Sequence, residues 1–121
     1  MRKSIFQLLC WILCLMPTQL FALTINETGG WFESAYTTFT PVEGAATYRV
    51  RIRPMNGEYV QLDAPLVRNY GTYGRADAIG LKAGEYQFEV TAMDNQGEPI
   101  PGEMAETQPF VVRAHDRAGF A

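Results

Sequence analysis

The chain has 121 residues, of which 47% are hydrophobic, and this supports one folded domain but leaves no room for two. Ten basic and thirteen acidic residues give a formal net charge of −3. Because an acidic surface repels phosphate backbones, this balance argues against nucleic-acid binding.

The first 22 residues have the character of an export signal. Arg2 and Lys3 give a positive start, a mostly apolar run follows over residues 5–16, and Ala22 is a small residue suited to cleavage. The apolar run is about a dozen residues long, shorter than the ~20 that a membrane-spanning helix needs. We therefore expect cleavage near Ala22 and a protein that is secreted, periplasmic or held at the cell surface. An uncleaved anchor is the alternative, and on either reading the export signal is the only expected contact with a membrane.

Cleavage would change the cysteine content and the charge. Cys10 and Cys14 are the only cysteines, so the mature chain could form no disulfide. A lipid anchor on Cys14 is a competing use, although Trp11 and Leu13 are bulky where such a site has smaller residues. Loss of two basic residues leaves eight against thirteen acidic ones, a net charge of −5. The remaining domain must then be stabilised by its core alone.

Short segments of alternating apolar and polar residues follow the export signal, which is typical of half-buried strands. We predict strands over residues 23–28, 34–40 and 48–53. Asn56-Gly57 is a strong hairpin signal and leads into a fourth strand over residues 59–62.

The second half of the chain begins with an irregular segment over residues 63–75 and a short predicted strand over 76–79. The most regular strand is 86–92, and a polar loop with two prolines separates it from a last strand over 107–114. About seven short strands without helical periodicity predict an antiparallel β-sandwich over residues 23–114. The residues expected to face its core together are Phe39, Tyr48, Val50, Leu81, Tyr86, Phe88 and Val90.

Two motifs in this range resemble fibronectin type III modules. FTPVEGAATYRV over residues 39–50 resembles the passage between their second and third strands, with Phe39 in place of the usual tryptophan. LKAGEYQFEVTA over residues 81–92 resembles the passage into their sixth strand, where Tyr86 would form the tyrosine corner. The resemblance implies a fibronectin type III-like or immunoglobulin-like sandwich.

Three further segments are similar to the leader module of secreted bacterial polysaccharide lyases of the pectate lyase type. They are GWFESAY over residues 30–36, LVRNYGTYGRAD over 66–77 and AHDRAGFA over 114–121. In those lyases, a segment like the last one precedes a catalytic parallel β-helix. The resemblance implies that residues 115–121 are a linker or the start of a missing catalytic domain, which would be the partner of this module. It carries over no catalytic or calcium-binding residue.

A row of arginines lies on the outward face of the third predicted strand, at positions 49, 51 and 53. In fibronectin-like sandwiches the third and sixth strands are neighbours, so Arg49, Arg51 and Arg53 would face the row that contains Glu89. Cross-strand pairing, worth a few tenths to ~1 kcal/mol per pair, explains part of the row. The functional alternative is a basic track that binds uronate carboxylates through bidentate guanidinium groups.

Aromatic residues outside the predicted core form the second candidate site. Tyr70 and Tyr73, flanked by Arg68 and Arg75, are the strongest glycan-binding candidates, because flat rings stack on sugar faces. The alternative for these rings is packing, either at the ends of the sandwich or under a neighbouring domain. The other aromatic residues of this kind are Trp31, Phe32, Tyr36 and Tyr59.

No group of residues in the sequence indicates catalysis. His115 and Asp116 are adjacent, but neighbours on an extended chain point apart. Residues 94–98 carry oxygen ligands without the spacing of a calcium loop. We expect no catalytic residue, metal or cofactor in this chain. Two functions stay open: a spacer or packing module beside a catalytic domain, and a module that binds pectin or another acidic polysaccharide. The second would use Arg49, Arg51, Arg53, Arg68, Tyr70, Tyr73 and Arg75.

Overall fold

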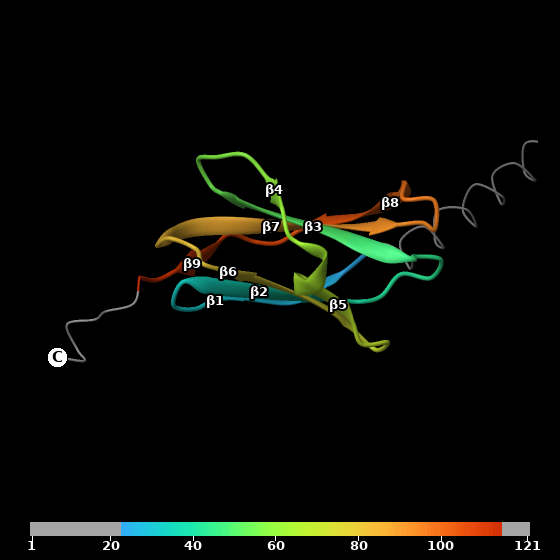
Figure 1. Ribbon diagram of the computed structural model, residues 1–121, viewed down its shortest axis with the longest axis horizontal. Coiled ribbons are helices and arrows are strands. Elements are labelled where there is room, and N and C mark those ends of the chain that lie inside the picture. The colour runs from blue at the N-terminus through green and yellow to red at the C-terminus, as the bar shows by residue number, and fades with distance from the viewer. Residues whose placement is uncertain (1–22, 115–121) are drawn as a thin grey trace, which may run out of the picture.

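The computed structural model describes residues 23–114, which form two packed β-sheets (Figure 1). Every pairing between named strands is antiparallel in this range, and the two sheets form a sandwich. The predicted all-β fold, a sandwich of antiparallel strands, is confirmed, and it fits a fibronectin type III-like or immunoglobulin-like module. The predicted export signal and the predicted linker over residues 115–121 lie outside the described residues. In the described range, no helix is long and apolar enough to cross a membrane.

The first sheet has the strand order β1-β2-β6-β5. Its central pair places Ala35 opposite Ala78 and Thr37 opposite Ala76, and all four side chains are buried. The residues between them point outward, as the period-2 pattern of the sequence predicts. The strands are β1 (Ile25–Gly30), β2 (Ser34–Phe39), β5 (Val67–Asn69) and β6 (Gly74–Ile79).

The second sheet has the order β4-β3-β7-β8, and a last strand, β9, pairs with the beginning of β7. Its centre is the long β3–β7 pair, which places Val50 opposite Val90 and Ile52 opposite Phe88. A short 3-10 helix, η1 (Ala64–Leu66), precedes β5. The strands are β3 (Thr47–Pro54), β4 (Val60–Gln61), β7 (Gly84–Met93), β8 (Pro99–Glu106) and β9 (Phe110–Val112).

The core lies between the sheets and contains the side chains predicted for it. Phe39, Val50, Phe88 and Val90 are fully buried, and the other three predicted residues are partly buried against them. Because Gly74 lies directly opposite Phe39, the ring fits only where a side chain is absent: a Cβ on Gly74 would lie 2.2 Å from Phe39 Cε2. Glycine at this position therefore makes room for the largest buried side chain of the first sheet.

Tyr86 forms the corner that the fibronectin resemblance implies. Its hydroxyl donates a hydrogen bond of 2.8 Å to the backbone carbonyl of Lys82, four residues earlier. A tyrosine at the start of the corresponding strand, with its hydroxyl bonded to the backbone a few residues upstream, is one of the hallmarks of immunoglobulin-like sandwiches. The bond ties the loop before β7 to the strand.

The structure contains two strands that the sequence prediction lacks, and the last strand, predicted over residues 107–114, is shorter than expected at Phe110–Val112. Residues 67–69 form β5 within the segment predicted to be irregular, and Pro99–Glu106 form β8 where a proline-containing loop is predicted. Both of the added strands are edge strands, and β8 accommodates its prolines because one side of an edge strand needs no backbone donors. The first strand also begins later than predicted, at Ile25, and extends to Gly30.

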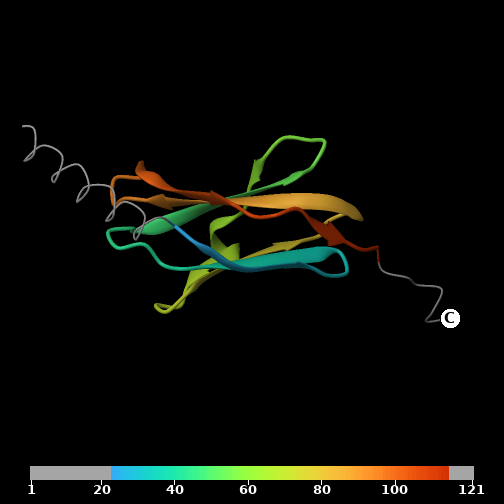
Figure 2. The same cartoon turned by 180° about the vertical axis from the view of Figure 1, so that it is seen from behind.

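The chain enters and leaves the sandwich at opposite ends, as the view from behind shows (Figure 2). At one end of the β1–β2 hairpin, the Thr40 N–H donates to the Thr24 carbonyl. At the other end, Arg113 forms a parallel bridge with Phe32 in the turn between the two strands. The long axis of the sandwich therefore separates the two points of attachment.

Candidate functional site

The seven residues predicted as a glycan site divide between the outer faces of the two sheets. Arg49, Arg51 and Arg53 belong to β3, where they alternate with the buried Val50 and Ile52. The other four lie on β5, on β6 and in the hairpin between them, in the opposite sheet. The fold therefore does not bring the two groups together in one site. These four are Arg68, Tyr70, Tyr73 and Arg75.

On the second sheet, the arginine row faces the row of β7 that the sequence predicts. Arg51 lies opposite Glu89, and its Nε and Nη2 both donate to one carboxylate oxygen in an ion pair. Arg53 lies opposite Gln87 and donates to its side-chain oxygen at 2.9 Å. Glu89 is only 7% exposed, and a carboxylate at that depth is costly unless it is paired. The row thus stabilises the β3–β7 pair.

Tyr59 covers the same arginines from outside. The guanidinium carbons of Arg51 and Arg53 lie 5.2 and 4.9 Å from the centre of its ring. Its hydroxyl donates to Glu106 on β8, and burial together with this bond raises the pKa of Tyr59 to about 12. Tyr59 therefore contacts β3 through its ring and β8 through its hydroxyl. Both arginines already use one edge of their guanidinium groups within the fold. Arg49, the third of the row, has a buried Nε without a hydrogen-bond partner among the described residues.

On the first sheet, Tyr70 and Tyr73 lie together in the β5–β6 hairpin. Their ring centres are 5.1 Å apart with planes inclined at 33°, and the Tyr70 N–H donates to the Tyr73 carbonyl. The turn contains Gly71 at φ +86°, a conformation that favours glycine. Both rings are exposed. Arg68 lies at the base of this hairpin, directly opposite Arg75 on the same outward face.

Arg75 is the centre of a group of polar contacts on that face. Its guanidinium donates to both carboxylate oxygens of Asp77 at 3.0–3.2 Å, and its central carbon lies 4.6 Å from the centre of the Tyr36 ring. The Tyr36 hydroxyl donates to Glu27 on β1, and this bond is the main reason why the pKa of Tyr36 is raised. The Tyr36 side chain can lie across β1 because the residue beneath it, Gly29, has no side chain. A Cβ at position 29 would lie only 2.9 Å from Tyr36 Cε1.

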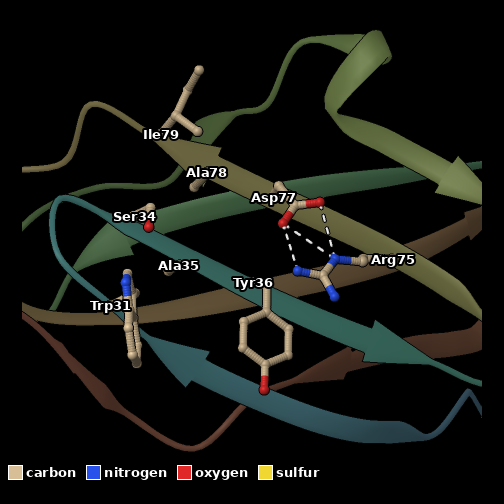
Figure 3. A pocket seen from close by; sticks show the side chains of 8 residues that line it. All are labelled: Trp31, Ser34, Ala35, Tyr36, Arg75, Asp77, Ala78 and Ile79. Carbon is tan, nitrogen blue, oxygen red and sulfur yellow. Dashed lines mark hydrogen bonds and ion pairs between the residues drawn. The ribbon is translucent and has the colours of Figure 1, made fainter.

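A hollow of about 470 Å³ lies beside this group, on the outer face of the first sheet (Figure 3). Tyr36 is seen face-on and Trp31 edge-on in this view, so Tyr36 lies along the sheet while Trp31 stands up from it. The Arg75–Asp77 pair lies on the far side of Tyr36 from Trp31. The lining residues are Trp31, Ser34, Ala35, Tyr36, Arg75, Asp77, Ala78 and Ile79.

The backbone around Trp31 is held firmly although its side chain is 69% exposed. Its N–H donates to the Ser34 carbonyl at 2.8 Å, and its carbonyl accepts from the Arg113 N–H at 3.1 Å. The Trp31 and Phe32 rings pack edge to face, with their centres 5.7 Å apart. Glu33 has a φ of 56°, a left-handed conformation that is uncommon for residues other than glycine. The turn thus fixes the backbone at Trp31, and the indole ring contacts the Phe32 ring.

Sequence reasoning singled out Trp31 and Tyr36 as aromatic residues outside the core, but it did not find Asp77 or Glu27. The signal for Asp77 was present, because residues two apart on a strand share a face and an Arg-x-Asp pair can therefore form an ion pair. Glu27 had no such signal, since its contact with Tyr36 depends on the β1–β2 register. Across residues 23–114, no three His, Cys, Asp or Glu side chains are grouped so that they could hold a metal ion.

Comparison with known proteins identifies structures that share the fold. No protein-family model and no curated protein matches the chain. The chain is similar to chitinase ChiW from Paenibacillus sp. str. FPU-7, a cell-surface-expressed multi-modular enzyme, with 8% identity and a TM-score of 0.56 over 73% of this chain and 8% of that one. It is also similar to a β-1,2-glucanase from Parabacteroides distasonis, with 16% identity and a TM-score of 0.54 over 78% of this chain and 13% of that one. The chain spans a small part of both enzymes, and at these identities the likeness shows the fold alone.

Proposed function

We propose that the chain is a non-catalytic accessory module of a larger, exported carbohydrate-active protein. The observation that carries this proposal is the position of the two chain ends. Thr24 lies at one end of the β1–β2 hairpin and Arg113 at the other, so a domain that follows Ala114 would lie at the end of the sandwich opposite to Leu23 (Figure 2). A first module with this geometry holds the N-terminal end of the protein away from the domain that follows, as a spacer does.

The fold neighbours support the same function. Both are carbohydrate-active enzymes in which a region similar to this chain forms only 8% or 13% of the polypeptide. The three segments that resemble the leader of pectate lyase-type enzymes give the proposal its finer form. In that form the sandwich precedes a catalytic β-helix and acts as its spacer or packing domain.

The alternative function, binding of an acidic polysaccharide, requires arginines that are free to pair with uronate carboxylates. Arg51 and Arg75 are already paired with Glu89 and Asp77, and Arg53 with Gln87. At Arg51 and Arg75, a uronate would have to displace a carboxylate that is attached to the same chain and therefore has a high effective concentration. The contacts of these arginines favour the spacer over this alternative.

An activity assay tests the non-catalytic part of the proposal. The purified secreted protein is incubated with polygalacturonate, chitin, β-1,2-glucan and xylan, and new reducing ends and unsaturated products are measured. We expect no turnover above the buffer control. Turnover that is lost in a folded point variant, such as Asp77→Asn, would locate an active site in this chain and contradict the proposal.

A further inference from the structure

We propose that the outer face of the first sheet binds a neutral oligosaccharide in the hollow between Trp31 and Tyr36, with the Arg75–Asp77 pair at its border. The inference rests on the proposed function in one respect, since it gives a ligand to an accessory module of a carbohydrate-active protein. It has its own basis in the shape, exposure and charge of the hollow (Figure 3).

The two aromatic rings provide the apolar contact that a sugar requires. Pyranose rings have C–H faces that pack on flat aromatic surfaces, as other apolar groups do. Trp31 is 69% exposed and stands up from the sheet, while Tyr36 lies along it (Figure 3). The Trp31 ring therefore lines one side of the hollow, and the Tyr36 ring lines its base. At about 470 Å³, the hollow is within the range of small-molecule sites.

The ion pair beside the rings provides the polar contact. The Arg75 and Asp77 side chains are 40% and 43% exposed, so a ligand can reach them. Arg75 Nη1 donates no hydrogen bond to any residue in the described part of the chain, and Asp77 Oδ2 accepts from Arg75 alone. An unused donor beside an acceptor oxygen with a further lone pair matches the adjacent hydroxyl groups of a sugar, each of which can both donate and accept.

The charges of the hollow favour a neutral sugar over a uronate. Its lining includes one cation and one anion, Arg75 and Asp77, which cancel. Glu27, which accepts from the Tyr36 hydroxyl, adds a negative charge next to the lining. A uronate carboxylate would therefore meet two carboxylates and one guanidinium that is already paired, whereas an uncharged hydroxyl can bond to either member of the pair.

A protein surface, either a neighbouring domain or a second copy of this chain, is the competing occupant. A dry protein contact over the hollow would bury Arg75 and Asp77, and removing an ion pair from water is costly unless the partner supplies matching polar groups. Sugar hydroxyls keep such groups hydrogen-bonded. The exposed ion pair therefore fits a hydrated glycan better than an apolar protein surface.

Titration by nuclear magnetic resonance tests the inference. Trp11 and Trp31 are the only tryptophans, so the Trp31 indole N–H signal can be assigned as the one that Trp31→Ala removes. The ligands are cellohexaose, xylohexaose and mannohexaose at up to millimolar concentration, with hexagalacturonate as the charged comparison. We expect at least one neutral ligand to shift the Trp31 indole and the backbone signals of residues 75–77.

Matched variants make the result specific. Trp31→Ala should weaken the binding of this neutral ligand by about tenfold, equivalent to ~1.4 kcal/mol, in line with the loss of a ring contact. Tyr73→Ala removes an exposed ring outside the hollow and should not change the affinity for this ligand. Asp77→Asn removes the negative member of the pair and should increase the response to hexagalacturonate.

Three results would overturn the inference: no shift with any neutral ligand, equal weakening by Tyr73→Ala, or wild-type binding of hexagalacturonate at the hollow that exceeds neutral binding. Shifts of Trp31 on dilution of the protein alone would indicate self-association there and would also contradict it. None of these results concerns whether the sandwich lacks catalysis or belongs to a larger protein, so the proposed function can hold when this inference fails.

Discussion

Replacing Phe88 with alanine should remove a large share of the stability of the sandwich. Phe88 is fully buried, lies opposite Ile52 on β3 and stacks on Phe110 with ring centres 5.1 Å apart. Truncation of a buried phenylalanine costs ~3–5 kcal/mol, because the transferred surface is lost and the cavity collapses only in part. A domain has ~5–15 kcal/mol in total. At roughly 4–8 °C per kcal/mol, the melting temperature should fall by roughly 12–40 °C.

Urea denaturation followed by far-ultraviolet circular dichroism measures this loss. The control is Val111→Ala on β9, because Val111 is 58% exposed and its truncation should change stability by less than ~0.5 kcal/mol. A loss below ~1 kcal/mol for Phe88→Ala would refute the reasoning. It would mean that β7 is shifted by one residue, since such a shift moves every side chain of a strand to the other face.

Three further predictions follow from single contacts. Gly74→Ala should cost ~1–3 kcal/mol in the same assay, because its Cβ would lie 2.2 Å from Phe39 Cε2 in a packed core. Tyr86→Phe should cost ~1 kcal/mol, because the Lys82 carbonyl loses its hydrogen bond. Tyr59 has a pKa of about 12 in the fold and ~10 in the unfolded chain, so the unfolded state loses its proton first. Stability should therefore be independent of this group below pH ~10 and fall between pH ~10 and ~12, and Tyr59→Phe should reduce that fall.

Each of these predictions has an outcome that contradicts it. Wild-type stability of Gly74→Ala would mean that the Phe39 ring lies elsewhere. An unchanged melting temperature of Tyr86→Phe would remove the corner bond as a stabilising contact. An identical fall in stability at alkaline pH in the wild type and Tyr59→Phe would show that other groups cause the fall.

The fold could be predicted from the sequence wherever the alternation of side chains was regular. Burial of Val50 and Val90 follows from period-2 patterns, and the β3–β7 pairing follows from the fibronectin resemblance. Strand β8 could not be found in this way, because Pro99 and Pro101 are usual in loops and only its place at a sheet edge makes them acceptable. Residues 67–69 form a strand mainly through pairing with β6, a contact to which their short local pattern gives no guide.

The candidate site was harder to predict than the fold. The Arg51–Glu89 pair was foreseeable, since both residues lie on outward faces of strands expected to be neighbours. The Arg75–Tyr36 contact was not, because it depends on the register of β2 against β6, and sequence periodicity does not determine that register. The backbone of the turn that carries Trp31 includes Glu33 at a φ of 56°, and no sequence signal predicts this conformation.

The most direct test of the proposed function is the identity of the native polypeptide that contains this sandwich. Antibodies raised against residues 23–114 can isolate it from the culture medium and cell envelope of the source organism, and mass spectrometry can then determine its length and peptides. We predict a polypeptide longer than 121 residues that begins at Leu23 and contains a polysaccharide-degrading domain. A free polypeptide no longer than this chain, in every fraction, would contradict the proposal that the sandwich is an accessory module.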